Sequence, residues 1–176
     1  IMADGGKGRG VVDRAGRDDL SPEEVTVLAE RAVLATGLLD PQVAPLLGTM
    51  VRADDFSDPR HAVVFESILR VLAMGAPVDV VTLAADLRAR ERLNTIGGAQ
   101  FLGELTDEIP STGHVEAHAR IVRESAARRR TADAARVVLA LCAGGASMAE
   151  IEIKTAAMSA ATVAAEDEGF CTLGEA

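Results

Sequence analysis

The chain lacks several of the residues that make particular classes of protein easy to recognise. It has no Trp or Tyr, four Phe and two Cys among 176 residues. Cys142 and Cys171 fit neither a disulfide framework nor a metal site, so we expect two free thiols in a reducing compartment. No apolar run approaches the roughly 20 residues needed to cross a bilayer, and the first residues lack a signal-peptide segment. These absences predict a cytoplasmic protein that does not engage a membrane.

Positive charge is also scarce. The formal net charge is −9, whereas nucleic-acid-binding proteins usually carry a basic surface that releases counterions from phosphates. The whole chain therefore gives no indication of strong direct DNA binding. The one basic concentration surrounds Arg128, Arg129 and Arg130, and successive helical residues point about 100° apart, so these three form no single stripe. We interpret them as a solvated helix with salt bridges, with an acidic partner protein as the main alternative.

The residues that are abundant favour helices. Hydrophobic residues make up 48% of the chain, enough for a core without disulfides or metal, and Ala, Leu and Val dominate among them. Ala and Leu are strong helix formers, and the aromatic residues typical of strands are scarce. The sequence therefore predicts an all-α fold.

Residues 21–111 predict a compact head of about five helices. Ser21-Pro22 is a helix start, with Ser as N-cap and Pro in the first turn, and Asp40-Pro41 ends that helix and opens a short one through about Met50. Asp58-Pro59 starts a third helix that runs to Gly75. Asp79 caps a fourth, and a fifth follows the Gly97-Gly98 break and ends before Pro110. The Gly-rich residues 1–20, in which opposite charges cancel, predict a disordered tail.

Residues 112–166 predict a protruding antiparallel hairpin. A helical pattern runs from about Thr112 to Cys142, Gly144-Gly145 turns the chain, and Ser147 caps a second helix that runs to about Glu166. In that helix Met148, Ile151, Thr155, Met158 and Thr162 are spaced 3, 4, 3 and 4, as in a coiled-coil seam. One helical pair buries only a stripe of each helix, so the pattern predicts self-association through the hairpin.

No combination of residues indicates a catalytic, cofactor or metal site. His114 and His118 lie four apart, but no third ligand accompanies them and Glu116 is in the wrong position for a zinc peptidase motif. Asp54-Asp55 and Asp107-Glu108 read as solvated helix-flanking acids. The run 5–8 resembles a phosphate loop only superficially, since it lacks the hydroxyl residue and the preceding strand.

Five segments in order resemble the N-terminal domain of DnaB-type replicative DNA helicases. Residues 30–39 are similar to the family pattern E-x-x-V-L-G-x-x-L-L, with Ala35 in place of the Gly. Residues 55–68 match D-F-x-x-x-x-H-x-x-I-F-x-x-I, with Val64 in place of the first Ile. The segments 75–87, 96–105 and 110–111 complete the resemblance. The motif residues have structural roles in this comparison and are Phe56, His61, Phe65, Asp79, Gly97 and Gly98.

The resemblance implies a non-catalytic assembly domain. In that family the N-terminal domains pair through their hairpins, form a collar of three dimers on a hexameric ring, and bind primase and, in some systems, a helicase loader. Neither the ATP- and magnesium-dependent motor nor its motifs are found in these 176 residues, so we expect no enzymatic activity and no cofactor. Residues 167–176 correspond to the start of the interdomain linker. The expected interface residues are Leu139, Met148, Ile151, Thr155 and Met158, with Arg128 and Arg129.

Two alternative functions remain open at this point. The helicase-interaction domain of a primase has a related helical head and hairpin, although residues 75–105 favour the helicase side. A stand-alone protein that regulates a helicase, without a motor of its own, is the other alternative. The partner, and whether copies assemble as dimers or hexamers, cannot be read from the sequence.

Overall fold

The computed structural model describes residues 20–107 and 113–167, with side chains described as far as residue 160. Every regular element in these ranges is helical, and no strand is present in them. The all-α prediction is confirmed. The elements are α1 (Pro22–Leu39), the 3₁₀ turn η2 (Ala44–Leu46), α2 (Leu47–Met50), the 3₁₀ turn η3 (Ala53–Asp55), α3 (Pro59–Ala73), α4 (Val80–Ala89), α5 (Ala99–Asp107), α6 (Val115–Ala143) and α7 (Met148–Asp167).

Local sequence signals account for most of the helix boundaries. At the start of α1 the Glu24 N–H donates to Ser21 Oγ at 3.2 Å and the Ser21 N–H donates to Glu24 Oε2 at 2.8 Å, a complete capping box. Asp79 begins α4 by accepting a hydrogen bond from the Thr82 N–H at 2.8 Å. The short second helix begins later than expected, because the Asp40 carboxylate accepts from the N–H groups of residues 42 and 43 and holds a turn there.

The head is built around α1. Helix α1 packs against α3, α5 and α6, and α3 also packs against α4. Its Val33, Leu34 and Ala35 have no exposed surface. The largest fully buried side chains that complete this core are Phe65, Leu47, Ile68, Leu83, Leu87, Ile96, Leu102 and Leu105.

The turn between α4 and α5 requires glycine. Gly97 and Gly98 have φ angles of +96° and +85°, a region that side chains with a Cβ rarely adopt. The Gly98 N–H donates to the Leu93 carbonyl at 2.9 Å and closes the turn. This geometry lets the chain reverse so that α5 returns to pack on α4 and α1.

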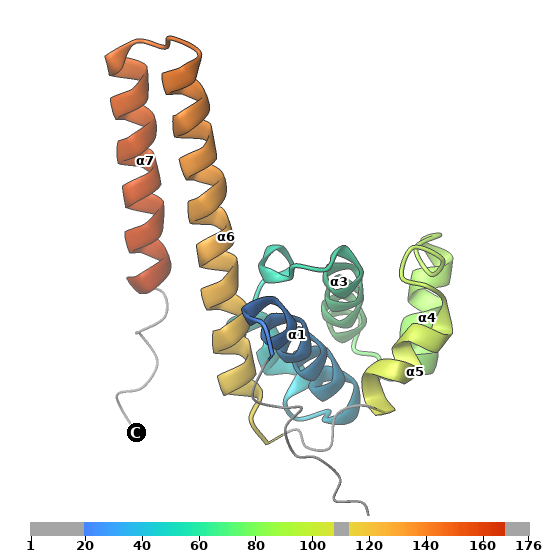
Figure 1. The fold of residues 1–176 in the computed structure, drawn as a ribbon. Helices are drawn as coiled ribbons and strands as arrows, with labels where there is room; N and C mark the ends of the chain where they lie inside the picture. Colours follow the sequence, from blue (N-terminus) through green and yellow to red (C-terminus); the bar gives the residue numbers. More distant parts are fainter. Residues whose placement is uncertain (1–19, 108–112, 168–176) are drawn as a thin grey trace, which may run out of the picture.

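Helices α6 and α7 form an arm that stands away from the head, as Figure 1 shows. The first half of α6 packs on α1 and buries Val115, Ala119, Val122 and Ala126. The second half continues past the head, and α7 runs back along it. The expected protruding hairpin is confirmed. None of the described helices combines the length and apolarity needed to span a membrane.

Two predicted segments lie mostly outside the described residues. The tail was placed at 1–20, and the description begins at residue 20. The linker was placed at 167–176, and the description ends with Asp167, the last residue of α7. The predicted start of the long helix, Thr112, also falls outside it; the described helix begins at Val115.

Candidate interaction surface

The arm exposes most of its side chains. No residue described from 127 to 160 is buried, although α7 packs along α6. The arm is one turn-linked pair, and Ser147 and Glu150 form a capping box that starts α7, with the Glu150 N–H donating to Ser147 Oγ at 3.3 Å. Two helices in contact cover only one face of each. The remaining faces of the arm are therefore open to solvent in a single copy.

Of the five apolar and hydroxyl residues expected at the intermolecular seam, two are half-buried and three are exposed in the structure. Ile151 and Met158 are half-buried on the side of α7 that packs against α6. Leu139 and Met148 remain 68% and 67% exposed. Thr155 is exposed, and its hydroxyl donates to the Ile151 carbonyl at 2.8 Å. Ile151 and Met158 are thus partly covered within one chain, whereas Leu139, Met148 and Thr155 are open to solvent, and their part in an intermolecular seam stays a prediction.

A second face of α7 carries the most exposed of the large apolar residues described in the arm. Ile153 is 71% exposed, and at about 100° per residue it points away from Ile151 and hence from α6. Ala149, Ala156 and Ala160 are exposed and share its face. Their spacing of 4, 3 and 4 is the same helical signal on the opposite side of the helix. It was available in the sequence but was overlooked in favour of the larger side chains.

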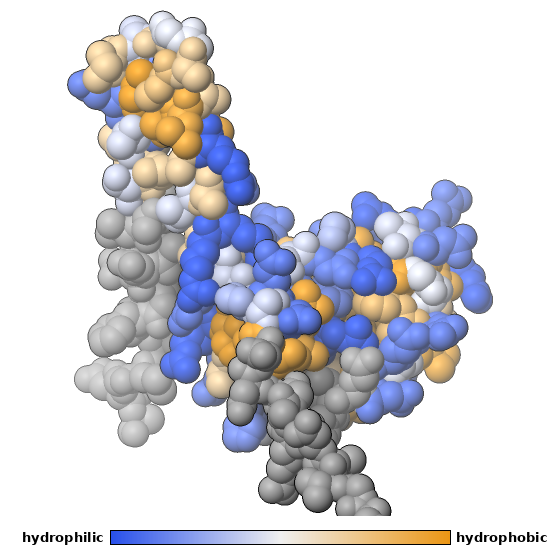
Figure 2. All heavy atoms as spheres, in the orientation of Figure 1, coloured by the Kyte–Doolittle hydropathy of each residue, from blue (hydrophilic) through white to orange (hydrophobic). Residues whose placement is uncertain are grey.

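Apolar surface gathers on the outer half of the arm, and hydrophilic surface follows α6 toward the head (Figure 2). We call Val137, Leu139, Met148 and Ile153 the exposed arm set. Val137, 44% exposed, extends the set on α6. The head also exposes large apolar residues, among them Leu28, Leu46 and Val81, but the arm projects its own set away from the head, and exposed apolar patches are typical of protein contact surfaces.

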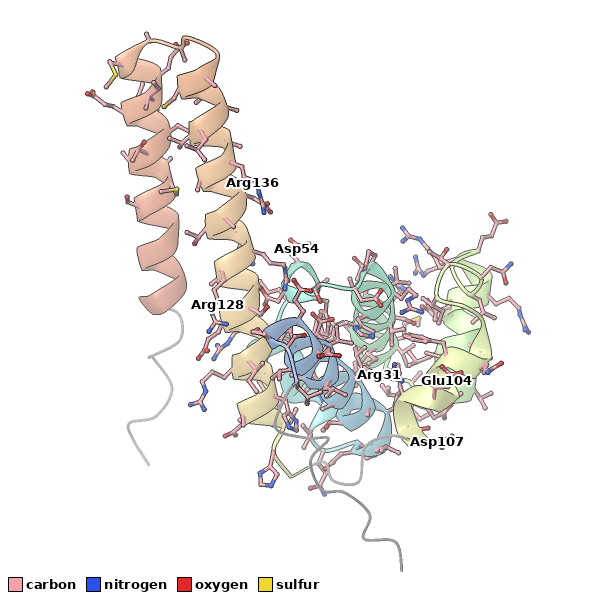
Figure 3. All side chains as sticks on the ribbon, in the orientation of Figure 1. Arg31, Asp54, Glu104, Asp107, Arg128 and Arg136 are labelled. Atoms are coloured by element: carbon pink, nitrogen blue, oxygen red, sulfur yellow. The ribbon has the colours of Figure 1, made fainter. Side chains whose placement is uncertain are left out.

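The two arginines expected at a partner contact point in different directions. Arg128 is 72% exposed and pairs with Glu124 at 3.4 Å on the same helix, on the side of α6 away from the head (Figure 3). Arg129 instead donates to the Asp55 carbonyl at 2.6 Å and to Ser125 Oγ at 3.3 Å. Arg129 is therefore engaged by its own head, and only Arg128 lies on the open surface.

A buried acid–histidine pair was not anticipated from the sequence. Glu30 and His61 are 0% and 1% exposed, and Glu30 Oε2 lies 2.7 Å from His61 Nδ1. The Ser57 N–H donates to Glu30 Oε1 at 2.5 Å. Burial, the largest single influence, acts to raise the pKa of the Glu30 carboxyl, yet the hydrogen bonds from His61 and Ser57 together hold that pKa below its ordinary value. An ionised carboxylate only accepts hydrogen bonds, so His61 Nδ1 carries the proton between them.

The two phenylalanines of the family motif pack beside this pair in the core. Phe65 is fully buried and Phe56 is 7% exposed, with their ring centroids 5.1 Å apart. The His61 ring stacks on Phe101 at 5.9 Å and meets Phe56 edge-on at 6.5 Å. The pair thus joins α1 to α3 inside an aromatic shell.

The histidines outside the core do not form a ligand cluster. His114 is exposed at the start of α6 and His118 is partly buried one turn later, where burial first and His114 second lower the pKa of His118. In the ranges 20–107 and 113–167 no group of three or more His, Cys, Asp or Glu side chains is placed to hold a metal ion.

Comparison with known proteins identifies the class and the family of this helical domain. The class is that of the helical N-terminal domains of DNA helicases, because the family model for the "DnaB-like helicase N terminal domain" matches residues 23–124. That match covers more than half of the chain. The chain belongs to the DnaB-like helicase N-terminal domain family, as the resemblance in the sequence predicted.

Curated relatives agree with this assignment. The replicative DNA helicase DnaB of Geobacillus stearothermophilus is 41% identical over 105 residues, which are 60% of this chain and 23% of the relative. The DnaB helicase of Mycobacterium leprae is 38% identical over 126 residues, 70% of this chain and 21% of the relative. The chain therefore spans about a quarter of the length of these relatives.

Solved structures show the same fold. The crystal structure of the N-terminal domain of DnaB helicase from Mycobacterium tuberculosis matches with a TM-score of 0.68 and 33% identity, over 76% of this chain and 93% of that one. A second structure, titled as a DnaB-like replicative helicase and its interactions with primase, matches in fold with a TM-score of 0.59 and 24% identity, over 75% of this chain and 30% of that one. The sequence left open two related helical domains, the N-terminal domain of the helicase and the helicase-interaction domain of a primase. The family model and the curated relatives match the first.

Proposed function

We propose that this chain is the non-catalytic assembly domain of a replicative DNA helicase, and that copies pair through the arm, residues 112–166. Membership of the family supports the first part. The exposed arm set, on a projection with no buried residue described beyond 126, supports the second. The unwinding activity would belong to an ATP- and magnesium-dependent motor outside these 176 residues.

The size of the arm suits a stable dimer. A helix of 20 residues such as α7 is about 30 Å long, and two helices side by side are roughly 20 Å wide. One face of the arm thus offers on the order of 600 Å² per copy, within the range of specific protein interfaces. Burying Ile153, together with Ala149 and Ala156 on the same face of α7, would supply the apolar centre that such interfaces require.

Light scattering coupled to size-exclusion chromatography tests the pairing at micromolar concentration. The parent chain is expected to elute as a dimer, or as a multiple of dimers. Ile153→Glu places a charge on the outer face of α7 and should give a monomer with an unchanged far-UV spectrum. Val81→Glu is the matched control, because Val81 is 78% exposed on α4 in the head. A strictly monomeric parent chain would exclude the pairing.

The assembled domains are further proposed to recruit primase or a helicase loader. The support is the family assignment, together with the fold shared with a helicase described with primase. Arg128, 72% exposed, pairs only within α6, whereas Arg129 and the 55% exposed Arg130 are bonded to Asp55 of the head, so Arg128 is the better placed for an acidic partner. Immobilised chain should retain purified primase or loader from the same organism, and Arg128→Glu should weaken that retention. If the immobilised chain retained a replicative helicase but neither primase nor loader, the result would favour the two alternatives. These are the helicase-interaction domain of a primase and a stand-alone regulator of a helicase.

A further inference from the structure

The larger apolar contacts of α6 with the head lie in its first two turns. Val115, Ile121 and Val122 pack in or against the core there, whereas toward the arm only Ala126 is still buried, and it is the last buried residue of α6. Alanine side chains allow close approach but interlock weakly, so they resist tilting of one helix over another less than large side chains do. Beyond this contact, α6 contains no Pro or Gly before its end at which it could kink. Any change in the direction of the arm must therefore come from α6 tilting as a rod on the head.

A polar cluster holds α6 where it leaves the head. Asp55, at the end of η3, is 4% exposed, so the expectation of a solvated acid is wrong for it, although it holds for Asp54. Its Oδ1 accepts from Arg130 at 2.9 Å, its main-chain oxygen accepts from Arg129 at 2.6 Å, and its Oδ2 accepts from the Arg52 N–H at 2.8 Å. Asp55 therefore receives three hydrogen bonds, two of them from consecutive side chains of α6. We call Asp55, Arg129 and Arg130 the Asp55 clasp.

The clasp is connected to α1 as well as to η3. Arg129 also donates to Ser125 Oγ at 3.3 Å, and Ser125 Oγ lies 3.1 Å from the hydroxyl oxygen of Thr26 on α1, which itself donates to the Pro22 carbonyl at 2.8 Å. Charge-assisted hydrogen bonds are short and directional. Contacts from one level of α6 to two separate parts of the head fix the tilt of a rod, which a single contact would leave free to pivot.

We infer that Asp55 is the positioning residue that sets the angle of the arm relative to the head. The lever is long: about 13 residues of α6 follow Arg130, or roughly 20 Å, so a tilt of 10° moves the tip by about 3 Å. The clasp thus determines where the exposed arm set is presented to a second copy or to another partner. The inference concerns the angle within one chain and holds whether or not arms pair.

Pulsed electron paramagnetic resonance between two spin labels measures this angle. Cys142 is exposed near the tip and takes one label, Glu91→Cys in the exposed turn after α4 takes the other, and Cys171→Ser removes the remaining thiol. Labelled chain is diluted with excess unlabelled chain carrying Cys142→Ser and Cys171→Ser, so that distances within one copy dominate. Asp55→Asn is compared with Asp54→Asn, an equal change of charge at the neighbouring exposed residue.

Asp55→Asn is expected to broaden the distance distribution or shift it by about 3 Å or more, and Asp54→Asn should leave it at the parental position. Thermal unfolding of both variants is followed to show that the fold persists. If Asp55→Asn does not fold, Arg129→Gln with Arg130→Gln removes the clasp from the other side, with Arg128→Gln and Arg136→Gln as the matched pair. A parental distribution in a folded clasp variant overturns the inference.

Discussion

The head and the arm are made from the same kinds of residue yet differ in what holds them. The head places Leu, Ile and Phe side chains from five helices around α1, with many of them fully buried. The arm, although it contains Val, Leu, Ile and Met, has no buried residue described between 127 and 160. The head can therefore fold by burying its own apolar surface, whereas the arm gains little from its own contacts.

The difference separates two uses of a hydrophobic pattern. In α3 the apolar positions are buried within the chain itself, because other helices of the head cover them. In α7 the apolar positions are divided between a narrow contact with α6 and a face with no partner in the described chain. Substitutions in the head should act mainly on stability, and substitutions in the arm mainly on association.

The largest effect is expected from the head's core. Phe65→Ala removes a fully buried ring and should lower the free energy of unfolding by about 3–5 kcal/mol. Leu141→Ala, at a half-buried position of the arm, should cost about 1 kcal/mol, as expected for burial of part of a leucine. Urea titrations of both variants, followed by circular dichroism at one concentration, make the comparison. Equal losses would show that the arm is as tightly packed as the head.

The buried pair makes the stability of the head depend on pH. Because the pKa of Glu30 is lowered from its ordinary 4.5, the folded chain binds fewer protons there than the unfolded chain, so the stabilisation is complete above pH 4.5 and is lost as the pH falls through the lowered pKa. Glu30→Gln should cost about 1–3 kcal/mol at pH 7, and the gap to the parent should close in acid. Glu66→Gln, at an exposed position of α3, serves as the control in thermal melts across pH 3–8. A gap that does not narrow as the pH falls below 4.5 would contradict the assignment.

Dilution should loosen the arm and leave the head unchanged. If arms are stabilised by pairing, tenfold dilution below the dissociation constant should speed amide exchange in α7 by up to about tenfold, since association stabilises by mass action. Exchange in α1 and α3 should not change with concentration. Hydrogen exchange with mass spectrometry at two concentrations measures both regions at once. Concentration-independent protection of α7 would mean that contacts within one copy suffice to hold the arm.

The smallest expected effects come from two equivalent helix caps. Ser21→Ala and Ser147→Ala each remove a capping-box hydroxyl, from α1 and α7, and each should cost about 1 kcal/mol. The first loss should appear as a lower midpoint of global unfolding. The second should appear only as faster exchange in the first turn of α7, because the arm can open without the head. Ser→Thr variants, which keep the hydroxyl, should behave like the parent.

The boundaries of the fold could be predicted because their causes are local. Ser21, Asp58 and Asp79 accept the first free N–H groups of their helices, and Gly97 supplies a turn with positive φ. Each signal lies within a few residues of the boundary that it sets. The periodic apolar residues also predicted the division into head and arm. The helical pattern is interrupted often in the head but runs without a break over the long helix that begins the arm.

The contacts that join distant segments could not be predicted in the same way. Glu30 and His61 are 31 residues apart, and Asp55 and Arg130 are 75 apart. Arg129 looks like its neighbour Arg128 in the sequence, but the packing of α6 on the head decides which of them faces Asp55. The spacing in α7 predicts a packing stripe but not what covers it: Ile151 and Met158 are partly covered where α7 packs along α6, and the pairing with a second copy stays a prediction.

Because α6 is one uninterrupted helix that belongs to the head for its first half, the molecule has no natural cutting point at residue 112. A truncated chain ending there would lose Val115, Ala119 and Val122, which are part of the hydrophobic core. Such a fragment would expose the side of α1 that α6 covers and should be prone to aggregation during expression. Shortening the arm from its tip instead, by moving the Gly144-Gly145 turn closer to Arg130, would leave the core intact.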